Sequence, residues 1–315
     1  MTTAKLVRSI VGLALVLVVS APVQAAPKVG VLMKAKSQFW GLAERGARQA
    51  SESLQVELVV RTPQRESDIG AQVQMFTALI EEGCEAIVVA PNSTEALVEP
   101  IFAARTRGVI VVVVDTQLAR DVAPVFVGVD QVEAGRTAGR LVAGMVNDGD
   151  VVCIFRHNLT SGATQQREAG ALEALGAAHP GLVLRGDIYA SVERGGETLR
   201  AEELLDQNPT VKAIIASGTP GTTGLLHVLK ERDMAGKVRF VGFGYNLNRT
   251  VTAALESGTM DAWIAQLPTE MGSRAIEVAV ALLNAEKVDP IVNTRFEVIT
   301  KENYRDPGNI ALMLD

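Results

Sequence analysis

Aromatic residues are scarce in this chain, and so are cysteine and histidine. Aromatic residues make up 4% of the 315 residues, with 2 Trp, 2 Cys and 3 His. Cys84 and Cys153 permit one disulfide in an oxidising compartment, but each lies in or beside a strand-like apolar run, where buried free thiols are the more common state. Because His157, His179 and His227 are scattered and none pairs with Cys at ligand spacing, the sequence predicts no metal site.

An excess of basic charge is also missing. The chain has 30 Lys and Arg against 36 Asp and Glu, a formal net charge of −6, which argues against a nucleic-acid partner. It lacks the nucleophile elbow, the phosphate-binding loop, the dinucleotide-binding glycine pattern and the H-x-x-x-H metal motif. These absences predict a binding protein without a cofactor, and an exported enzyme is the weaker alternative.

Only the N-terminus carries a long apolar run. Lys5 and Arg8 precede the run Ile10–Val19, and small residues follow with the pattern Val23-Gln24-Ala25. This arrangement predicts a signal peptide over residues 1–25, cleaved after Ala25, because the apolar run is too short to span a membrane. The alternative is an uncleaved anchor. No Cys follows the run, so the sequence predicts no lipid attachment there, and the mature chain is expected to work outside the cytoplasm.

Short runs that are apolar on both faces alternate with stretches of helical periodicity. Such runs are typical of buried parallel strands. The predicted strands are Val29–Met33, Val56–Val60, Ala86–Ala90, Val109–Val114, Val125–Val129, Val151–Phe155, Val183–Ile188, Ala213–Ala216, Arg239–Phe243 and Ala262–Ala265. The predicted helices include Phe39–Leu54, Ile69–Glu82, Thr94–Arg107 and Gln131–Val146. Repeated βα units of this kind predict an α/β fold with doubly wound parallel sheets.

The alternation of strand and helix breaks once. Only Asp115–Pro124 separates Val109–Val114 from Val125–Val129, which is too short and polar for a crossover helix. We therefore expect the chain to leave one sheet there and open a second, giving two Rossmann-like lobes. A single sheet of ten strands is the alternative, and strongly twisted sheets rarely reach that size. No Pro-, Gly- or Ser-rich linker separates the halves, so short hinge strands are expected to join them.

Polar and aromatic residues follow several of the predicted strands. In open parallel sheets, ligands bind beyond the carboxyl ends of the strands. The loops there contain Ser37, Phe39, Trp40, Asp115, Arg167 and Gln266. Aromatic rings can cover the C–H face of a sugar, a carboxylate accepts from two hydroxyls, and a guanidinium donates in a fork. The alternative is structural: Phe39 and Trp40 as core, Asp115 as a turn residue and Arg167 as a solvated charge.

At these loops the sequence resembles the periplasmic sugar-binding proteins of the ribose, allose and galactose type, the type I substrate-binding proteins of ABC importers. The resemblance covers essentially the whole chain after the signal peptide. It is carried by Phe39-Trp40, Val114-Asp115, Val127-Gly128-Val129-Asp130, Arg167-Glu168-Ala169-Gly170, Val241-Gly242-Phe243 and Ala265-Gln266-Leu267-Pro268. Each motif is short, but their order and spacing are specific.

The resemblance implies two lobes that close on a sugar in the periplasm. It places the first lobe at residues 26–129 and 267–293, and the second at 130–266 and 294–315, with hinge crossings near Val129–Gln131, Gln266–Leu267 and Val292–Thr294. Phe39 and Trp40 match stacking positions, and Ser37, Asp115, Arg167 and Gln266 match polar contact positions. The expected partners are a small neutral sugar or polyol and a membrane permease, with the protein a monomer. A receptor presenting its ligand to a membrane sensor is the alternative.

Three positions depart from the family pattern. Thr116 stands where an Arg is usual after the aspartate, Gly218 where an Asn is usual, and Gly244 where an Asp is usual. Losing these side chains removes hydrogen bonds, so ribose itself is doubtful as the ligand and we expect room in the second lobe for a different or larger one. Further candidate contacts are Lys34, Asn92, Thr116, His157, Tyr245 and Asn246.

Overall fold

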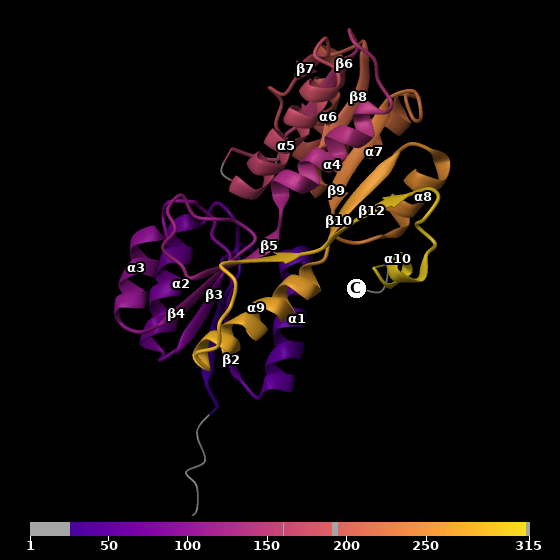
Figure 1. The fold of residues 1–315 in the computed structure, drawn as a ribbon. Helices are drawn as coiled ribbons and strands as arrows, with labels where there is room; N and C mark the ends of the chain where they lie inside the picture. Colours follow the sequence, from indigo (N-terminus) through magenta and orange to yellow (C-terminus); the bar gives the residue numbers. More distant parts are fainter. Residues whose placement is uncertain (1–25, 160, 191–194, 313–315) are drawn as a thin grey trace, which may run out of the picture.

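The computed structural model describes residues 26–159, 161–190 and 195–312. The predicted signal peptide lies outside these residues. Two bodies of similar size lie one above the other in Figure 1, each built around one sheet. We call each sheet with its helices a lobe. Within the described ranges, no helix has both the length and the apolar character needed to cross a membrane.

The first lobe contains a six-stranded sheet covered on both faces. Its strands run in the order β11 (Ile291–Thr294), β5 (Val125–Val129), β4 (Ile110–Val114), β3 (Ala86–Val89), β1 (Lys28–Leu32) and β2 (Glu57–Arg61), all parallel. Helices α1 (Gln38–Leu54) and α9 (Pro268–Leu283) pack on one face, and α2 (Ile69–Glu81) and α3 (Val98–Thr106) on the other. Burial on both faces explains why these strands are continuous apolar runs.

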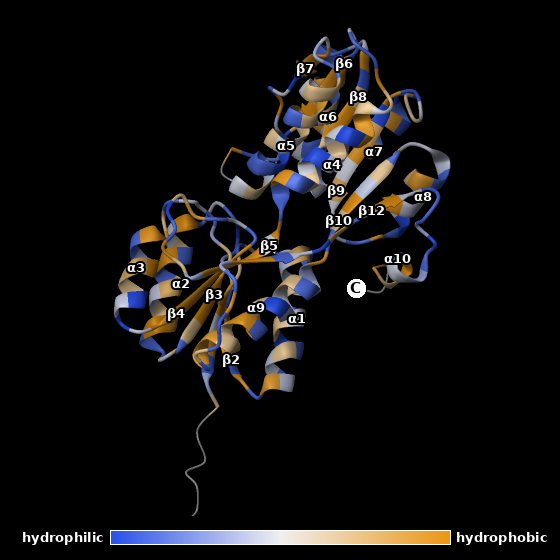
Figure 2. Ribbon diagram, in the orientation of Figure 1, coloured by the Kyte–Doolittle hydropathy of each residue, from blue (hydrophilic) through white to orange (hydrophobic). Residues whose placement is uncertain are grey.

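The second lobe repeats this order. Its strands are β12 (Phe296–Thr300), β10 (Ala262–Gln266), β9 (Arg239–Gly244), β8 (Val211–Ala216), β6 (Val151–Phe155) and β7 (Val183–Arg185). Helices α4 (Gln131–Ala143) and α5 (Gly162–Ala178) cover one face, and α6 (Gly196–Gln207), α7 (Thr219–Glu231) and α8 (Arg249–Ser257) the other. Apolar colour concentrates in the strands of both lobes in Figure 2. The predicted α/β fold with two parallel-dominated sheets is confirmed.

The predicted point of exit from the first sheet is wrong. β4 and β5 are parallel neighbours in the same sheet, with Val112 opposite Val125, although no helix connects them. Residues 115–124 form a loop that begins at the ion-paired Asp115, and its Leu118, Val122 and Ala123 pack on the face of the sheet that α2 and α3 cover. The chain leaves the first sheet only after Val129. The strand predicted over Val183–Ile188 ends at Arg185, and β11 and β12 were not predicted as strands.

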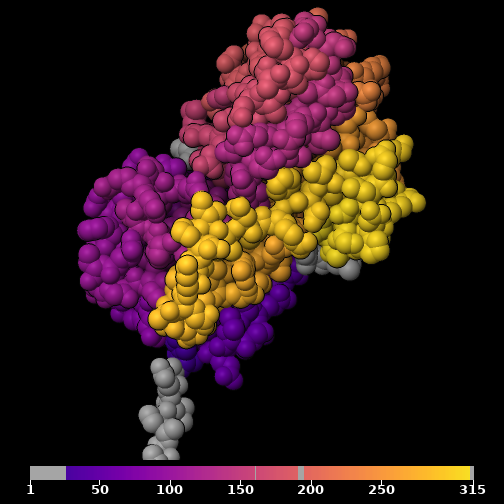
Figure 3. All heavy atoms as spheres, in the orientation of Figure 1, coloured from indigo at the N-terminus to yellow at the C-terminus, as the bar shows by residue number. Residues whose placement is uncertain are grey.

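Three single residues connect the lobes. Asp130 links β5 to α4, Leu267 links β10 to α9, and Arg295 links β11 to β12. β11 joins the first sheet in parallel, with Thr294 opposite Val129, whereas β12 joins the second sheet antiparallel to β10. In Figure 3 the C-terminal part of the chain, coloured yellow, lies across both lobes.

Reciprocal glycines bring two helices together in each lobe. A Cβ at Gly46 of α1 would lie 1.9 Å from the carbonyl oxygen of Thr269, and one at Gly272 of α9 would lie 1.9 Å from that of Ala43. In the second lobe, Gly135 of α4 meets the carbonyl of Arg167 at 1.9 Å, and Gly170 of α5 meets that of Val132 at 2.1 Å. Any larger residue would push these helix backbones apart.

Candidate functional site: the cleft between the lobes

The carboxyl ends of the parallel strands in both lobes face the boundary between the lobes, which we call the cleft. Candidate residues from the first lobe follow β1, β3 and β4, and those from the second lobe follow β6, β9 and β10. Side chains of the two lobes meet at this boundary. Gln166 Nε2 donates to Gln117 Oε1 at 3.1 Å, and Tyr245 Oη donates to Gln38 Oε1 at 3.4 Å. These contacts place the candidate side chains between the two lobes.

On the first-lobe wall, Asp115 forms a buried ion pair with Lys34. Lys34 Nζ lies 2.6 Å from Asp115 Oδ2 and 2.6 Å from Thr116 Oγ1, and Thr116 Oγ1 in turn donates to Asp115 Oδ2 at 3.0 Å. The side chains of Lys34 and Asp115 are only 4% and 9% exposed. Asp115 Oδ1 accepts no hydrogen bond from any described residue. One carboxylate oxygen and one ammonium hydrogen therefore stay free for a ligand.

The backbone at Asp115 is itself unusual. Its φ of 63° lies in the left-handed region, which non-glycine residues seldom adopt. Hydrogen bonds hold this conformation: Asp115 N donates to Val127 O at 3.0 Å, and Thr116 N donates to Val114 O at 2.7 Å. Strained positions of this kind cluster at binding and catalytic sites, which supports Asp115 as a functional residue.

Asn92 stabilises the loop that contains Lys34. Asn92 Nδ2 donates to the carbonyl of Lys34 at 3.0 Å, and Gln72 holds Asn92 by donating from Nε2 to its Oδ1 and accepting from its N–H. Both amide side chains are buried. Gln72 was missed by sequence analysis because it lies within helix α2 and no strand end marks it.

Three aromatic rings form an edge-to-face chain across the cleft. The Phe39 and Trp40 centroids lie 4.8 Å apart, and Phe39 and Tyr245 lie 5.4 Å apart. Trp40 is 4% exposed and Lys34 Nζ lies 5.7 Å from its ring centroid. Tyr245 comes from the second lobe, so these rings also form a contact between the lobes. Ser37, by contrast, is exposed, and its Oγ caps α1 by accepting from Trp40 N at 3.4 Å.

On the second-lobe wall, Arg167 is held by neutral groups. Its Nε and Nη2 donate to Gln131 Oε1 at 3.1 and 2.6 Å, its Nη1 donates to the carbonyl of Ser217, and its guanidinium lies 4.4 Å from the centroid of the Phe243 ring. Arg167 is 3% exposed. Burial lowers the pKa of Arg167 to about 10, while Asp115 and Glu168 oppose this shift. Two of its five N–H groups have no acceptor among the described residues.

Gln131 connects Arg167 with Gln266. Its Oε1 accepts from Arg167, and its Nε2 donates to Gln266 Oε1 at 3.1 Å. Gln131 is buried at the start of α4, directly after the first crossing between the lobes. Sequence analysis treated it only as part of that crossing. Because Gln266 accepts from Gln131, the Nε2 amide group of Gln266 remains available.

His157 lies near charged groups of both lobes. Burial lowers its pKa most, Arg167 and Lys34 lower it further, and Glu66 and Asp115 oppose these effects. Its Nδ1 is shielded from solvent and has no partner among the described residues. The imidazole is therefore neutral at neutral pH, with one nitrogen unpaired. Asn246 is buried, and its Oδ1 accepts from Asn248 Nδ2 at 3.4 Å.

Glu168 supports this wall from behind. Its Oε1 accepts from Ser217 Oγ at 2.7 Å and from His157 N at 3.3 Å, and its Oε2 lies 3.5 Å from Arg156 Nε. Burial raises the pKa of Glu168, and these hydrogen bonds and the neighbouring cations partly oppose the shift. Oε1 is therefore fully used within the protein, whereas Oε2 has only the ion pair with Arg156.

The expected room at Gly218 and Gly244 is not there. A Cβ at Gly218 would lie 3.1 Å from His157 Nδ1, and a Cβ at Gly244 would lie 2.1 Å from two ring carbons of Trp263. Trp263, a strand residue of β10, is 1% exposed. Rings from neighbouring segments therefore occupy the space that the two glycines leave, which corrects the expectation of a roomier second lobe.

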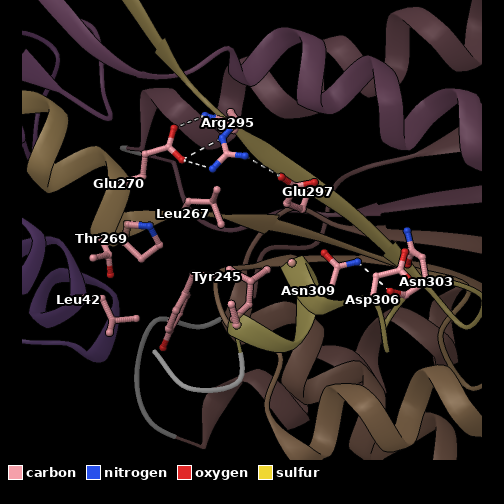
Figure 4. A pocket seen from close by; sticks show the side chains of 14 residues that line it. Leu42, Tyr245, Leu267, Thr269, Glu270, Arg295, Glu297, Asn303, Asp306 and Asn309 are labelled. Carbon is pink, nitrogen blue, oxygen red and sulfur yellow. Dashed lines mark hydrogen bonds and ion pairs between the residues drawn. The ribbon is translucent and has the colours of Figure 1, made fainter.

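A separate cavity of about 540 Å³ lies beside two of the crossings. Figure 4 shows Glu270, Arg295 and Glu297 on one side of it and Asn303, Asp306 and Asn309 on another. Arg295 Nη2 lies 2.8 Å from Glu270 Oε2, and its Nη1 lies 3.7 Å from Glu297 Oε1. Of the predicted site residues, Tyr245 alone is among those that line this cavity. The cavity is therefore distinct from the cleft.

Cys84 and Cys153 are both buried free thiols. Burial raises their pKa values to about 11 and about 12. No group of His, Cys, Asp and Glu within the described ranges is arranged to hold a metal ion. The thiols are thus inert core residues.

This fold and cleft define a two-lobed binding protein of the periplasmic type. The chain belongs to the periplasmic binding protein domain family, whose model matches residues 29–287. It is 27% identical to a D-ribose/D-allose-binding protein of Pseudomonas aeruginosa over 87% of this chain and 89% of that protein. It is 26% identical to the D-allose-binding periplasmic protein of Escherichia coli over 87% of this chain and 90% of that one.

Solved structures agree with these sequence relatives. A carbohydrate transporter solute-binding protein from Agrobacterium radiobacter, in complex with D-arabinose, superposes with a TM-score of 0.82 at 27% identity. The match covers 92% of this chain and 99% of that one. The predicted resemblance to sugar-binding proteins is therefore confirmed, and so is the class of binding protein rather than enzyme.

Proposed function

We propose that the protein captures a small uncharged sugar or polyol in the periplasm and delivers it to the membrane permease of an ABC importer, acting as a monomer. The named relatives bind ribose and allose, and the structural relative holds D-arabinose. Among the relatives are ribose import binding proteins, which favours import over sensing.

The observation that carries this proposal is the pattern of unpaired polar groups between the lobes. The first lobe offers a carboxylate oxygen of Asp115, and the second offers two N–H groups of Arg167 and the amide of Gln266. Phe39 and Tyr245 add flat apolar surface, and the buried ring of Trp40 packs edge-to-face against Phe39. Hydroxyl groups both donate and accept, so a polyhydroxylated ligand satisfies both walls.

Charge in the cleft favours an uncharged ligand. The charges that act on His157 and Glu168 are the cations Lys34, Arg156 and Arg167 and the carboxylates Glu66 and Asp115, to which Glu168 adds its own. They balance, so an anion or cation would enter without a compensating charge. Of the predicted contacts, Lys34, Asn92, Thr116 and His157 are proposed to shape the walls as well as to touch the ligand.

Lobe closure is proposed to accompany binding. The predicted division, with residues 26–129 and 267–293 in one lobe and 130–266 and 294–315 in the other, is supported by the single-residue links at Asp130, Leu267 and Arg295. A ligand that contacts both walls favours the closed state because those contacts exist together only there.

Calorimetry with D-ribose, D-allose, D-arabinose and xylitol tests the proposal. At least one probe is expected to bind with a micromolar dissociation constant, about −8 kcal/mol, and to compact the protein in small-angle scattering. Asp115→Asn is expected to abolish this binding, and Asp121→Asn, at an exposed carboxylate in the same loop, to leave it intact. A panel with no binding sugar contradicts the function. Uptake of the bound probe by cells with and without the gene tests the import step.

A further inference from the structure

Equivalent positions in the two lobes present opposite chemistry to the cleft. Val114 pairs with Val127 in the first sheet, and Phe243 pairs with Ile264 in the second. Helices α4 and α9 begin at Gln131 and Pro268, four residues after Val127 and Ile264 respectively. The residue after Val114 therefore corresponds to the residue after Phe243. Asp115 and Gly244 occupy the same place in their lobes.

Trp263 is the reason that position 244 has no side chain. Cζ2 and Cη2 of its indole lie 2.1 Å from where a Cβ of residue 244 would stand, and Thr219 Oγ1 lies 3.2 Å from that point. The ring is 1% exposed and belongs to the core of the second lobe. Because backbone and a rigid buried ring meet here, no rotamer of a larger residue at 244 escapes the clash.

Next to Gly244, this wall offers the carbon atoms and the N–H of the indole, the N–H groups of Arg167, and one hydroxyl, that of Thr219. Indole has a donor and no acceptor, and Arg167 has donors only. Glu168 Oε1 already accepts from Ser217 and His157, and Glu168 Oε2 lies in the ion pair with Arg156. At the corresponding place in the first lobe, Asp115 Oδ1 is a free acceptor. Hydroxyls that donate are satisfied at the first wall, whereas beside Gly244 they find the Thr219 hydroxyl in place of a carboxylate.

We propose that Trp263, acting through Gly244, is a specificity-determining residue that selects a ligand with two unlike ends. One end carries the donating hydroxyls and meets Asp115. The other carries a hydrogen-bond-accepting oxygen for Arg167 and C–H, methyl or methylene groups against Gly244, as in a deoxy sugar or deoxy polyol. Of a pair of donating hydroxyls at this second end, the Thr219 hydroxyl can accept from one, and the other loses its partner on binding, which costs about tenfold or more in affinity. This inference rests on the proposed sugar-binding function.

Matched pairs of hydroxylated and deoxy probes test the selection. The pairs are D-ribose with 2-deoxy-D-ribose and 5-deoxy-D-ribose, and D-galactose with D-fucose (6-deoxy-D-galactose). Calorimetry on the full mature chain gives the affinity ratio within each pair. We expect at least one deoxy probe to bind as tightly as its hydroxylated parent, or more tightly. If every hydroxylated parent binds more than tenfold better than its deoxy partner, the inference is overturned while the sugar-binding function stands.

Exchanging the two side chains tests the cause. The double variant Trp263→Leu with Gly244→Asp removes the ring and restores a carboxylate, and it is expected to shift the ratio at least tenfold toward the hydroxylated parent. Trp263→Leu alone is the matched control, because it opens the same space without an acceptor and should keep the original preference. Equal ratios in the two variants overturn the role of position 244. If the double variant does not fold, the ratios measured on the unmodified protein still decide the inference. If no probe binds the unmodified protein, the sugar-binding function fails as well.

Discussion

In the first lobe, Gly46 and Gly272 let α1 and α9 touch at their backbones, and in the second lobe Gly170 and Gly135 do the same for α5 and α4. The strand order is also the same in both sheets. The lobes nevertheless differ at the cleft, where the first presents the carboxylate of Asp115 and the second a glycine backed by Trp263. The two lobes therefore share one framework, while the residues after the strands are free to diverge.

Removing the Asp115 carboxylate from the first-lobe wall should have the largest effect on both stability and binding. Asp115→Ala leaves the Lys34 ammonium buried without its partner, so we expect a loss of about 3–5 kcal/mol in the free energy of unfolding. Affinity for a sugar that binds the unmodified protein should fall by about a hundredfold or more, because a charged hydrogen bond is lost and the wall rearranges. Urea denaturation and calorimetry measure the two effects.

The double variant Lys34→Met with Asp115→Ala separates stability from binding. Removing both charges should recover most of the lost stability, since no unpaired ion remains in the protein, while binding stays lost. Restored binding in the double variant would mean that Asp115 only neutralises Lys34.

Adding a methyl group at the helix contacts tests whether these contacts contribute equally to the stability of the two lobes. Gly46→Ala and Gly135→Ala each place a Cβ 1.9 Å from a carbonyl oxygen, and each should destabilise the protein by about 1–3 kcal/mol. Gly41→Ala is the control, because its Cβ meets nothing within 4 Å on α1, and it should be neutral or stabilising by up to about 1 kcal/mol. Denaturation midpoints that do not distinguish Gly46→Ala from Gly41→Ala would refute the close contact.

Measuring the free energy of unfolding against pH tests the effect of burying His157 in the second-lobe wall. Because the pKa of His157 is lowered in the folded protein, the unfolded chain binds the extra proton first as the pH falls below about 6.5, and stability drops in that range. His157→Gln should reduce the loss of stability between pH 7.5 and 5.5. Glu168, whose pKa is raised, favours the folded state in acid in both proteins, so it cancels in the comparison. An identical acid response in the variant would exclude His157 as the cause.

The smallest effect is expected at the third crossing. Arg295 bridges Glu270 on the first-lobe side and Glu297 on the second-lobe side, but its side chain is 70% exposed. Exposed ion pairs contribute little, so Arg295→Ala should change the free energy of unfolding by less than about 1 kcal/mol. A larger change in thermal unfolding would show that this bridge holds the lobes together.

Much of the framework was predictable from the apolar runs. Doubly buried strands such as Ile110–Val114 stand out because both faces must be apolar, and the two lobes follow from their number. β11 and β12 escaped prediction because they are short and partly exposed, so their sequences lack this signal. The place of exit from the first sheet was wrong because a parallel connection of ten residues without a helix is rare.

The candidate site was predictable to the level of the strand ends. Asp115, Arg167 and Gln266 follow strands, and the structure brings them to one cleft, with Gln131 between the latter two. The Lys34–Asp115 pair and the filling of Gly244 by Trp263 were not predictable, because both depend on side chains far apart in the sequence meeting across strands. A glycine in the sequence shows that a side chain is absent, but it does not show which neighbouring residue fills the space.

The three links between the lobes have a mechanical consequence. Val129, Gln266 and Thr294 are each tied into a sheet, and the residue two positions further on already belongs to an element of the other lobe. A swing of one lobe must then be absorbed by the torsion angles of Asp130, Leu267 and Arg295, with almost no slack for sliding. With links this short, we expect any rotation of one lobe against the other to be limited by how far those few bonds can turn.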